Sequence, residues 1–312
     1  MKFLMCTDGE EYAEAAVRFG GKLAKAIGAD VSVLHVRSPI SPSERVYLTT
    51  ARKKLTEWNL EIPGVEYLIR AREILTEIGL TKTASSEEGK IGPAFEGGVE
   101  GATELHMVGP RGENVRLRLR EGHPVDEILE EAKVGDYDLI IVGSRGHQGG
   151  LSAHFVGSTA LRVADLAPCS VLIAKNIREA DHFLICTDGS QLSERAEIAG
   201  AEMARATGAQ VTLLSVAEEE QGREVAERMT RRAEMILAQM GIEAKPLVRI
   251  GSPFEEIIDE AKDHDIVVMG ASGSSAVKKF FLGSVPLKVI EYGKCPVLIV
   301  REKRGRISLQ AE

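Results

Sequence analysis

The sequence contains two copies of one pattern, and this repeat limits the possible folds more than any other feature. The stretch 138–146 returns as 265–273, and a Gly-Ser pair follows each copy, at 157–158 and at 283–284. Each copy is a short β-branched apolar run with charge before it and glycine after it. Such a run predicts a strand that is buried on both faces and leads into a glycine loop at its carboxyl end.

The same repeat extends over the rest of the chain. Residues 3–9 match residues 183–189 at an offset of 180, and Gly28 and Gly208 each end an apolar stripe with helical spacing. Each half reads β-α-β-α-β-α-β-α-β, and this alternation is typical of a parallel sheet with helices on both faces. The predicted fold is therefore α/β, with two repeated doubly wound domains, each a five-stranded parallel sheet flanked by helices.

The domain boundaries follow from the same alignment. We expect a first domain at 1–176, a second at 180–302 and a C-terminal tail at 303–312. Between Val36 and Gly122 the offset falls from 180 to 129, so the first repeat carries 51 additional residues. They predict an added helix near 44–59 and an insertion at about 81–112.

The insertion has few large apolar residues. Its glycine- and glutamate-rich part, 84–101, buries too little surface to offset the entropy of ordering it, which predicts a mobile surface loop. The alternative is a lid or partner-docking element over the first site. Residues 103–108 and 114–120 read as two strands around a turn. The alternating arginines of the second strand indicate either an anion patch or, as we prefer, the solvated face of an edge strand.

Composition excludes some classes of function. The formal net charge is −8, which argues against a nucleic-acid interface but leaves room for a small anion held by backbone amides. The opening residues are too short for a signal peptide, no apolar stretch approaches the roughly 20 residues of a membrane span, and the four cysteines form no CxxC. We expect a cytoplasmic protein with buried, unpaired cysteines.

The glycine loops indicate the position of the functional site. A loop at a strand's carboxyl end that faces a helix N-terminus can hold phosphate oxygens, because free N–H groups and the positive end of the helix dipole point there. The chain has no G-x-G-x-x-G, no Walker A motif, no pyrophosphatase loop, no metal-ligand spacing and no nucleophile–base pair. These absences weaken the alternative of an ATP-dependent ligase or adenylating enzyme, and no catalytic residue can be named.

These residues resemble the universal stress proteins in their tandem two-domain form, whose fold is adenine nucleotide alpha hydrolase-like. Nucleotide-binding members of that family carry G-x2-G-x9-G-[S/T] and an Asp at the end of the first strand. The second repeat matches this spacing, whereas the first has ten residues, not nine, before its Gly-Ser pair. The family often has a further Ser or Thr two positions after the serine of the final Gly-Ser pair, where this chain has Ala160 and Pro286.

The resemblance implies ATP held at the strand ends of one or both repeats, with Mg²⁺ as the cation that commonly accompanies triphosphates. It assigns a carboxylate to the ribose or adenine, backbone groups to the adenine edge, two glycines to close approach and a Gly-Ser pair to the phosphates. In the first repeat these residues are Asp8, Val36, Gly143, Gly146, Gly157 and Ser158. In the second repeat they are Asp188, Val216, Gly270, Gly273, Gly283 and Ser284.

The functional hypothesis is a stress-associated, ATP-binding regulatory protein with at most slow ATP hydrolysis. The resemblance also implies that the halves pack as a pseudo-dimer with approximate two-fold symmetry through their last strands, 171–174 and 297–300. A protein partner is expected but unknown, and further homo-oligomerisation is left open. One alternative is a tandem scaffold that binds no nucleotide and takes a protein or apolar ligand. A second alternative is that Asp8 and Asp188 only cap the helices that follow them.

Overall fold

The computed structural model describes residues 1–39, 63–81, 96–97, 103–144, 156–178, 180–271 and 282–303. The first repeat contains most of the predicted elements, in the predicted order. They are β1 (Lys2–Cys6), α1 (Glu11–Ile27), β2 (Asp30–Arg37), α3 (Val65–Glu77), β3 (Glu96–Gly97), β4 (Thr103–Val108), β5 (Asn114–Glu121), α4 (Pro124–Gly135), β6 (Leu139–Gly143), α5 (Ser158–Leu166) and β7 (Ser170–Ala174). The added helix predicted near 44–59 lies outside the described residues, as does most of the 81–112 insertion, including its predicted loop or lid.

The second repeat follows the same plan without the additional strands. Its elements are β8 (His182–Cys186), α6 (Gln191–Thr207), β9 (Gln210–Ala217), α7 (Arg223–Gln239), β10 (Ala244–Ile250), α8 (Pro253–Glu260), β11 (Ile266–Gly270), α9 (Ser284–Tyr292) and β12 (Val297–Val300). Proline opens both α4 and α8, and a left-handed glycine ends both α1 and α6. The local rules that predicted these boundaries therefore operate in both halves.

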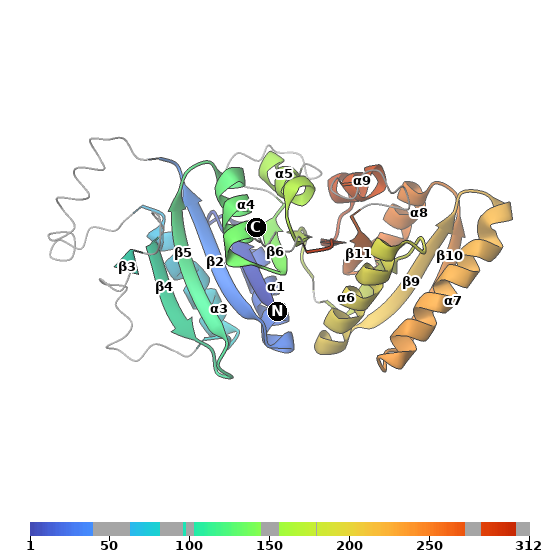
Figure 1. The fold of residues 1–312 in the computed structure, drawn as a ribbon, viewed down its shortest axis with the longest axis horizontal. Helices are drawn as coiled ribbons and strands as arrows, with labels where there is room; N and C mark the ends of the chain where they lie inside the picture. The colour runs from blue at the N-terminus through green and yellow to red at the C-terminus, as the bar shows by residue number, and fades with distance from the viewer. Residues whose placement is uncertain are drawn as a thin grey trace, which may run out of the picture.

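All the strands belong to one 12-stranded sheet that runs the length of the molecule (Figure 1). Its order is β10-β9-β8-β11-β12-β7-β6-β1-β2-β5-β4-β3. Each repeat contributes five parallel strands, as predicted, and the two halves join where β12 pairs antiparallel with β7, with Leu298 opposite Leu172. The order reads the same outward from this pair in both directions, so the repeats are related by an approximate two-fold axis through it.

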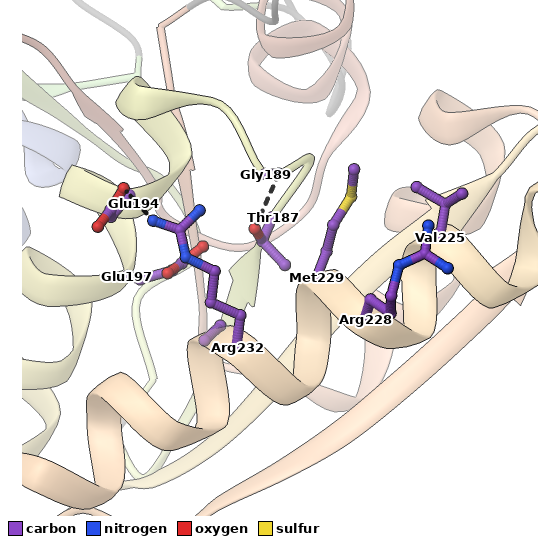
Figure 2. Close-up of a pocket in the computed structure, with 9 residues that line it drawn as sticks. Thr187, Gly189, Glu194, Glu197, Val225, Arg228, Met229 and Arg232 are labelled. Carbon is purple, nitrogen blue, oxygen red and sulfur yellow. Dashed lines mark hydrogen bonds and ion pairs between the residues drawn. The ribbon is translucent and has the colours of Figure 1, made fainter.

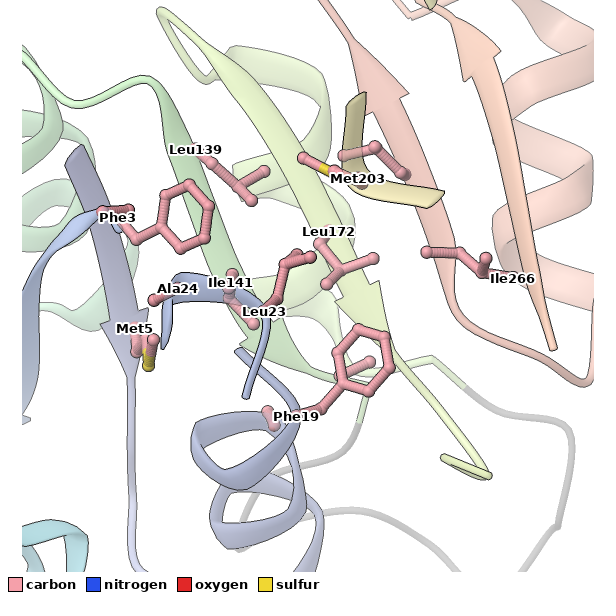
Figure 3. Close-up of a cluster of buried hydrophobic side chains, with 14 of the residues drawn as sticks. Phe3, Met5, Phe19, Leu23, Ala24, Leu139, Ile141, Leu172, Met203 and Ile266 are labelled. Atoms are coloured by element: carbon pink, nitrogen blue, oxygen red, sulfur yellow. The ribbon is translucent and has the colours of Figure 1, made fainter. Parts of the chain in front are cut away.

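The core crosses the boundary between the repeats. Successive residues of β1 point to opposite faces of the sheet, so that Phe3 and Met5 enter one apolar cluster and Leu4 and Cys6 the other. Each cluster contains buried residues of both repeats, and Figure 3 shows side chains of the two halves gathered in the first. All four cysteines are free and buried, as predicted, and burial raises the pKa of Cys169 to about 12.

Two basic side chains tie the halves together beyond the sheet. Lys175, which follows β7, donates from Nζ to carbonyl oxygens at the C-terminal end of α9, those of Ile290 and, at 2.7 Å, of Gly293. Arg301 holds the corresponding position after β12 and donates to Ala164 O near the end of α5. A cation is favoured at a helix C-terminus, because the last carbonyls and the helix dipole are negative there. Each repeat thus contributes a cap to the other.

The arginine-bearing strand differs from the prediction. The two strands and the turn between them are present as β4 and β5, but β5 lies inside the sheet between β2 and β4. Arg118 and Arg120 reach α4, where both pair with Glu131, and Arg120 Nε also donates to Glu127 at 2.6 Å. The interpretation as a solvated edge strand was therefore wrong. In the part of the chain that the structure describes, no helix is long and apolar enough to cross a membrane.

Candidate functional site

The ends of β1 and β2 meet at one edge of the sheet in the first repeat. Thr7 N donates to Leu34 O at 2.9 Å, and the register of the two strands places Asp8 level with Val36. Asp8 is half-buried, and its Oδ1 accepts a hydrogen bond from Glu10 N at 3.2 Å. The neighbour of β1 on its other side is β6, so this edge is the topological switch point where open α/β sheets bind ligands.

The second repeat builds the same turn. Thr187 N donates to Leu214 O at 2.8 Å, and Asp188 Oδ1 accepts from Ser190 N at 3.0 Å. Here the helix cap is Ser190, whose hydroxyl accepts from Ser193 N at 3.1 Å. Asp188 therefore shapes the turn before α6 and does not cap the helix, and its exposed carboxylate keeps an oxygen that accepts no hydrogen bond within the described residues.

The glycines that end β6 and β11 are required by packing. A Cβ on Gly143 would lie 3.1 Å from backbone atoms of Tyr12 and Ala13, and one on Gly270 would lie 2.9 Å from the carbonyl carbon of Leu192. Each glycine thus lets the start of the first helix of its repeat approach the end of β6 or β11. This close approach brings the Asp turn beside the glycine loop.

The two glycine loops are anchored identically. Gly157 N donates to Ser144 O at 2.8 Å, and Gly283 N donates to Ala271 O at 2.7 Å. Ser144 N and Ala271 N in turn donate hydrogen bonds to the last strand of their repeat, to Ala174 O and Val300 O. The additional residue of the first loop therefore falls between two anchors that match those of the second loop. Gly146 and Gly273 lie inside the loops and outside the described residues.

Helices α5 and α9 begin at these anchors. Ser158 and Ser284 are exposed first residues, each preceded by an extended glycine, and no side chain from the described part of the chain caps either helix. The first-turn N–H groups, which have no partner inside a helix, therefore point toward the loop. The helices differ in one respect, because Pro286 removes an N–H from the first turn of α9 whereas Ala160 keeps the corresponding one in α5.

Two side chains near the Asp turns were not predicted. The ring of Tyr67, on α3, lies against Gly9, where an added Cβ would be 2.1 Å from Tyr67 Cδ1. Tyr67 also makes an edge-to-face contact with His35, whose pKa is lowered by burial. In the second repeat Met229, on α7, packs over Gly189 in the same way. Aligning 65–80 with 227–242 would have paired Tyr67 with Met229, although it could not have shown either contact.

The sequence matches the family model of the universal stress proteins twice, over residues 1–175 and 179–301. The universal stress protein Slr1230 of Synechocystis is 24% identical over 305 residues, which cover 96% of this chain and 99% of the relative.

A solved structure that spans both repeats has the same fold. A universal stress protein from Archaeoglobus fulgidus superposes with a TM-score of 0.65 at 20% identity, covering 96% of this chain and 98% of its own. A single-domain universal stress protein from the same organism, solved in complex with dAMP, covers 40% of this chain and 100% of its own at 22% identity, with a TM-score of 0.34. Two family matches in tandem account for nearly all of the sequence, and the chain belongs to the universal stress protein family.

Proposed function

We propose that the protein binds ATP at the strand ends of one or both repeats and acts as a stress-associated regulatory protein. The observation that carries this proposal is the duplicated juxtaposition of an Asp turn and an uncapped helix N-terminus across the switch point of each half. If the Asp turns were only structural, nothing would require α5 and α9 to begin without a side-chain cap beside them. An anion at that helix end would gain the amide hydrogen bonds and the favourable dipole.

The residues fit an adenine nucleotide in a definite order. Asp8 and Asp188 would hold the ribose, and the backbone of Val36 and Val216 would meet the adenine edge. The triphosphate would extend along the loop through Gly143 and Gly146, or Gly270 and Gly273. It would end at Gly157-Ser158 or Gly283-Ser284, where exposed hydroxyls and amides converge. Mg²⁺ would then be held chiefly by phosphate oxygens, as it commonly is in nucleotide sites.

Regulation by occupancy follows from how the loops are anchored. Nucleotide binding would bias the conformations of the loops at 144–157 and 271–283, and with them the 81–112 insertion, and so change the surface that a partner protein meets. By linkage, this change is limited to the difference in the nucleotide's affinity for the two loop states. The carboxylates among the proposed binding residues, Asp8 and Asp188, are assigned to the ribose and not to the phosphates, so the protein is expected to bind ATP and to hydrolyse it slowly at most.

The test is calorimetric titration of ATP with Mg²⁺ into nucleotide-free protein and into Gly157→Val and Gly283→Val. Both glycines have extended backbone, so that valine adds bulk at the phosphate position without conformational strain. We expect each variant to lose one binding event if both repeats are competent, with circular dichroism confirming the fold. The first turn of α5 has one more backbone N–H group than that of α9. The binding event with the lower dissociation constant should therefore be the one that Gly157→Val removes.

Two results would change the proposal. Loss of binding in Gly283→Val alone would restrict ATP to the second repeat and show that the longer loop of the first repeat misplaces the phosphates. No binding by the nucleotide-free wild type would overturn the proposal and favour a scaffold that takes a protein or apolar ligand.

A further inference from the structure

The second repeat contains a cavity beside the Asp turn. Its volume is about 310 Å³, and it lies between α6 and α7 beneath the turn at Gly189 (Figure 2). Its walls combine apolar and charged side chains: Thr187, Glu194, Glu197, Val225, Arg228, Met229, Arg232 and Ala233. This volume is at the lower end of the range for small-molecule sites, so it suits a compact ligand.

Glu197 is the unusual member of this lining. Its side chain belongs to a residue that is only 3% exposed, and burial raises the pKa of its carboxyl group. Within the described residues no basic side chain lies at ion-pair distance from it. Arg232 pairs with Glu194 at 2.9 Å and Arg228 with Glu224 at 3.3 Å. A hydrogen bond from Thr187 and the more distant charge of Arg232 offset the effect of burial on the Glu197 pKa only in part. A buried carboxylate with no basic group at ion-pair distance is costly to ionise, so a cation that entered the cavity would be favoured beside it.

The first repeat has an apolar residue at the position that corresponds to Glu197. The residue corresponding to Glu197 is Val17, which is fully buried. The residues corresponding to Arg228 and Met229 are Glu66 and Tyr67. The alignment is supported by an ion pair common to both halves, Glu14–Arg70 in the first and Glu194–Arg232 in the second.

The contrast between the halves concerns both space and charge. In the first repeat an aromatic ring covers the turn, an apolar side chain forms the floor and Glu66 accepts a hydrogen bond from Gly64 N at 2.8 Å. In the second repeat a flexible methionine replaces the ring, a carboxyl group replaces the apolar floor and an arginine replaces Glu66. The cavity therefore carries a buried acid and a base at its rim that its structural twin lacks.

We propose that this cavity binds a small zwitterion of the ω-amino-acid class. The ammonium group would donate to Glu197 and Thr187 on the floor. The carboxylate would meet Arg228, whose pair with Glu224 is an exposed contact within its own helix. Val225 and Met229 would cover the methylene chain. An ammonium ion would place a positive charge within hydrogen-bond distance of Glu197, where the described residues provide none, and this is the reason for assigning this end to the floor. The inference does not depend on nucleotide binding.

The test uses methionine labelled with ¹³C at the methyl group, because Met229 lines the cavity and reports occupancy by NMR. The probes are 3-aminopropionate, 4-aminobutyrate and 5-aminopentanoate, with butylamine and butyrate as single-charge controls. At least one zwitterion should shift the Met229 signal with a dissociation constant of about 1 mM or below, and the single-charge controls should bind at least about tenfold more weakly. Met229→Leu assigns the signal.

Variants separate binding in this cavity from binding elsewhere on the protein. Glu197→Gln, which keeps the shape of the side chain, should weaken binding at least about tenfold, and Glu197→Val should abolish it by restoring the first-repeat residue. The matched control Glu66→Gln should bind normally, as should Gly283→Val, which addresses the nucleotide site. The proposal is overturned if no zwitterion shifts Met229, if butylamine binds as well as the zwitterion, or if a folded Glu197→Gln protein retains full affinity.

Discussion

At the scale of single residues, Glu197 is a carboxyl group held in a buried environment. Burial raises its pKa, Glu194 and Asp188 add to this effect, and Thr187 and Arg232 oppose it. Its carboxyl group is therefore harder to ionise in the folded protein than in the unfolded chain, where a glutamate has a pKa of about 4.3. The native state loses stability relative to the unfolded state as pH rises from that value through the raised pKa.

Glu197→Gln should remove this pH dependence. At pH 4 the two proteins should have similar melting temperatures, since the glutamate is largely neutral in both states. Between about pH 4 and pH 8 the wild type should lose stability relative to the variant, because only the wild type must ionise a buried group. Thermal unfolding followed by circular dichroism across this range measures the difference. A gap in melting temperature that stays constant with pH, or that the exposed control Glu218→Gln reproduces, would contradict this account.

At the scale of elements, the packing of α4 on β5 depends on a buried ionic cluster. Glu131 is 0% exposed and accepts hydrogen bonds from Arg118, from Arg120 at 3.1 Å and from Tyr137 Oη at 2.9 Å. The second repeat has a single related pair within its described residues, Arg249–Glu260 at 2.6 Å, whose arginine is 45% exposed on the edge strand β10. The two halves thus provide a buried and an exposed version of one interaction.

Glu131→Gln should lower the free energy of unfolding by about 3 kcal/mol, because two partly buried guanidinium groups lose the charge of the buried carboxylate that they share. The corresponding variant Glu260→Gln should lower it by less than about 1 kcal/mol, since its partner is solvated. Urea unfolding of both variants gives the two values. Equal losses would mean that burial does not set the strength of this contact.

At the scale of the whole molecule, the repeats form one sheet with shared apolar clusters and are not two independently packed domains. Lys175 and Arg301 add reciprocal caps across the two-fold axis. Removing one cap leaves buried carbonyl oxygens of the opposite repeat without a donor, and unsatisfied buried polar groups are costly.

Lys175→Met keeps the length of the side chain but removes its charge and its donors. It should reduce the free energy of unfolding by about 2 kcal/mol, in a single transition shared by both repeats. The control Lys303→Met removes a more exposed pair with Asp138 and should change it by less than about 1 kcal/mol. Hydrogen exchange under urea identifies which repeat opens. Loss of protection in α9 alone would show that the repeats unfold independently.

The repeated pattern determined much of this protein before any contact was known. The five parallel strands of each half and the strand-end position of Asp8 and Asp188 follow from local periodicity and from general rules of sheet topology. The pairing of β7 with β12 was expected only from the family resemblance, and the structure confirms it. These features could be predicted because each depends on residue types close together in the chain. The roles of the site residues remain a prediction for calorimetric titration to test.

Only the tertiary structure decided what distant side chains do to one another. The alternation of β5 was visible in the sequence, but whether its arginines faced solvent depended on β4 covering its edge and α4 covering its face. In the same way, Glu197 reads as an ordinary helix residue until α7 packs against it and a methionine leaves a space that tyrosine fills in the other repeat. Burial, ion pairing and cavity volume arise from the packing of whole elements, so local sequence patterns cannot specify them.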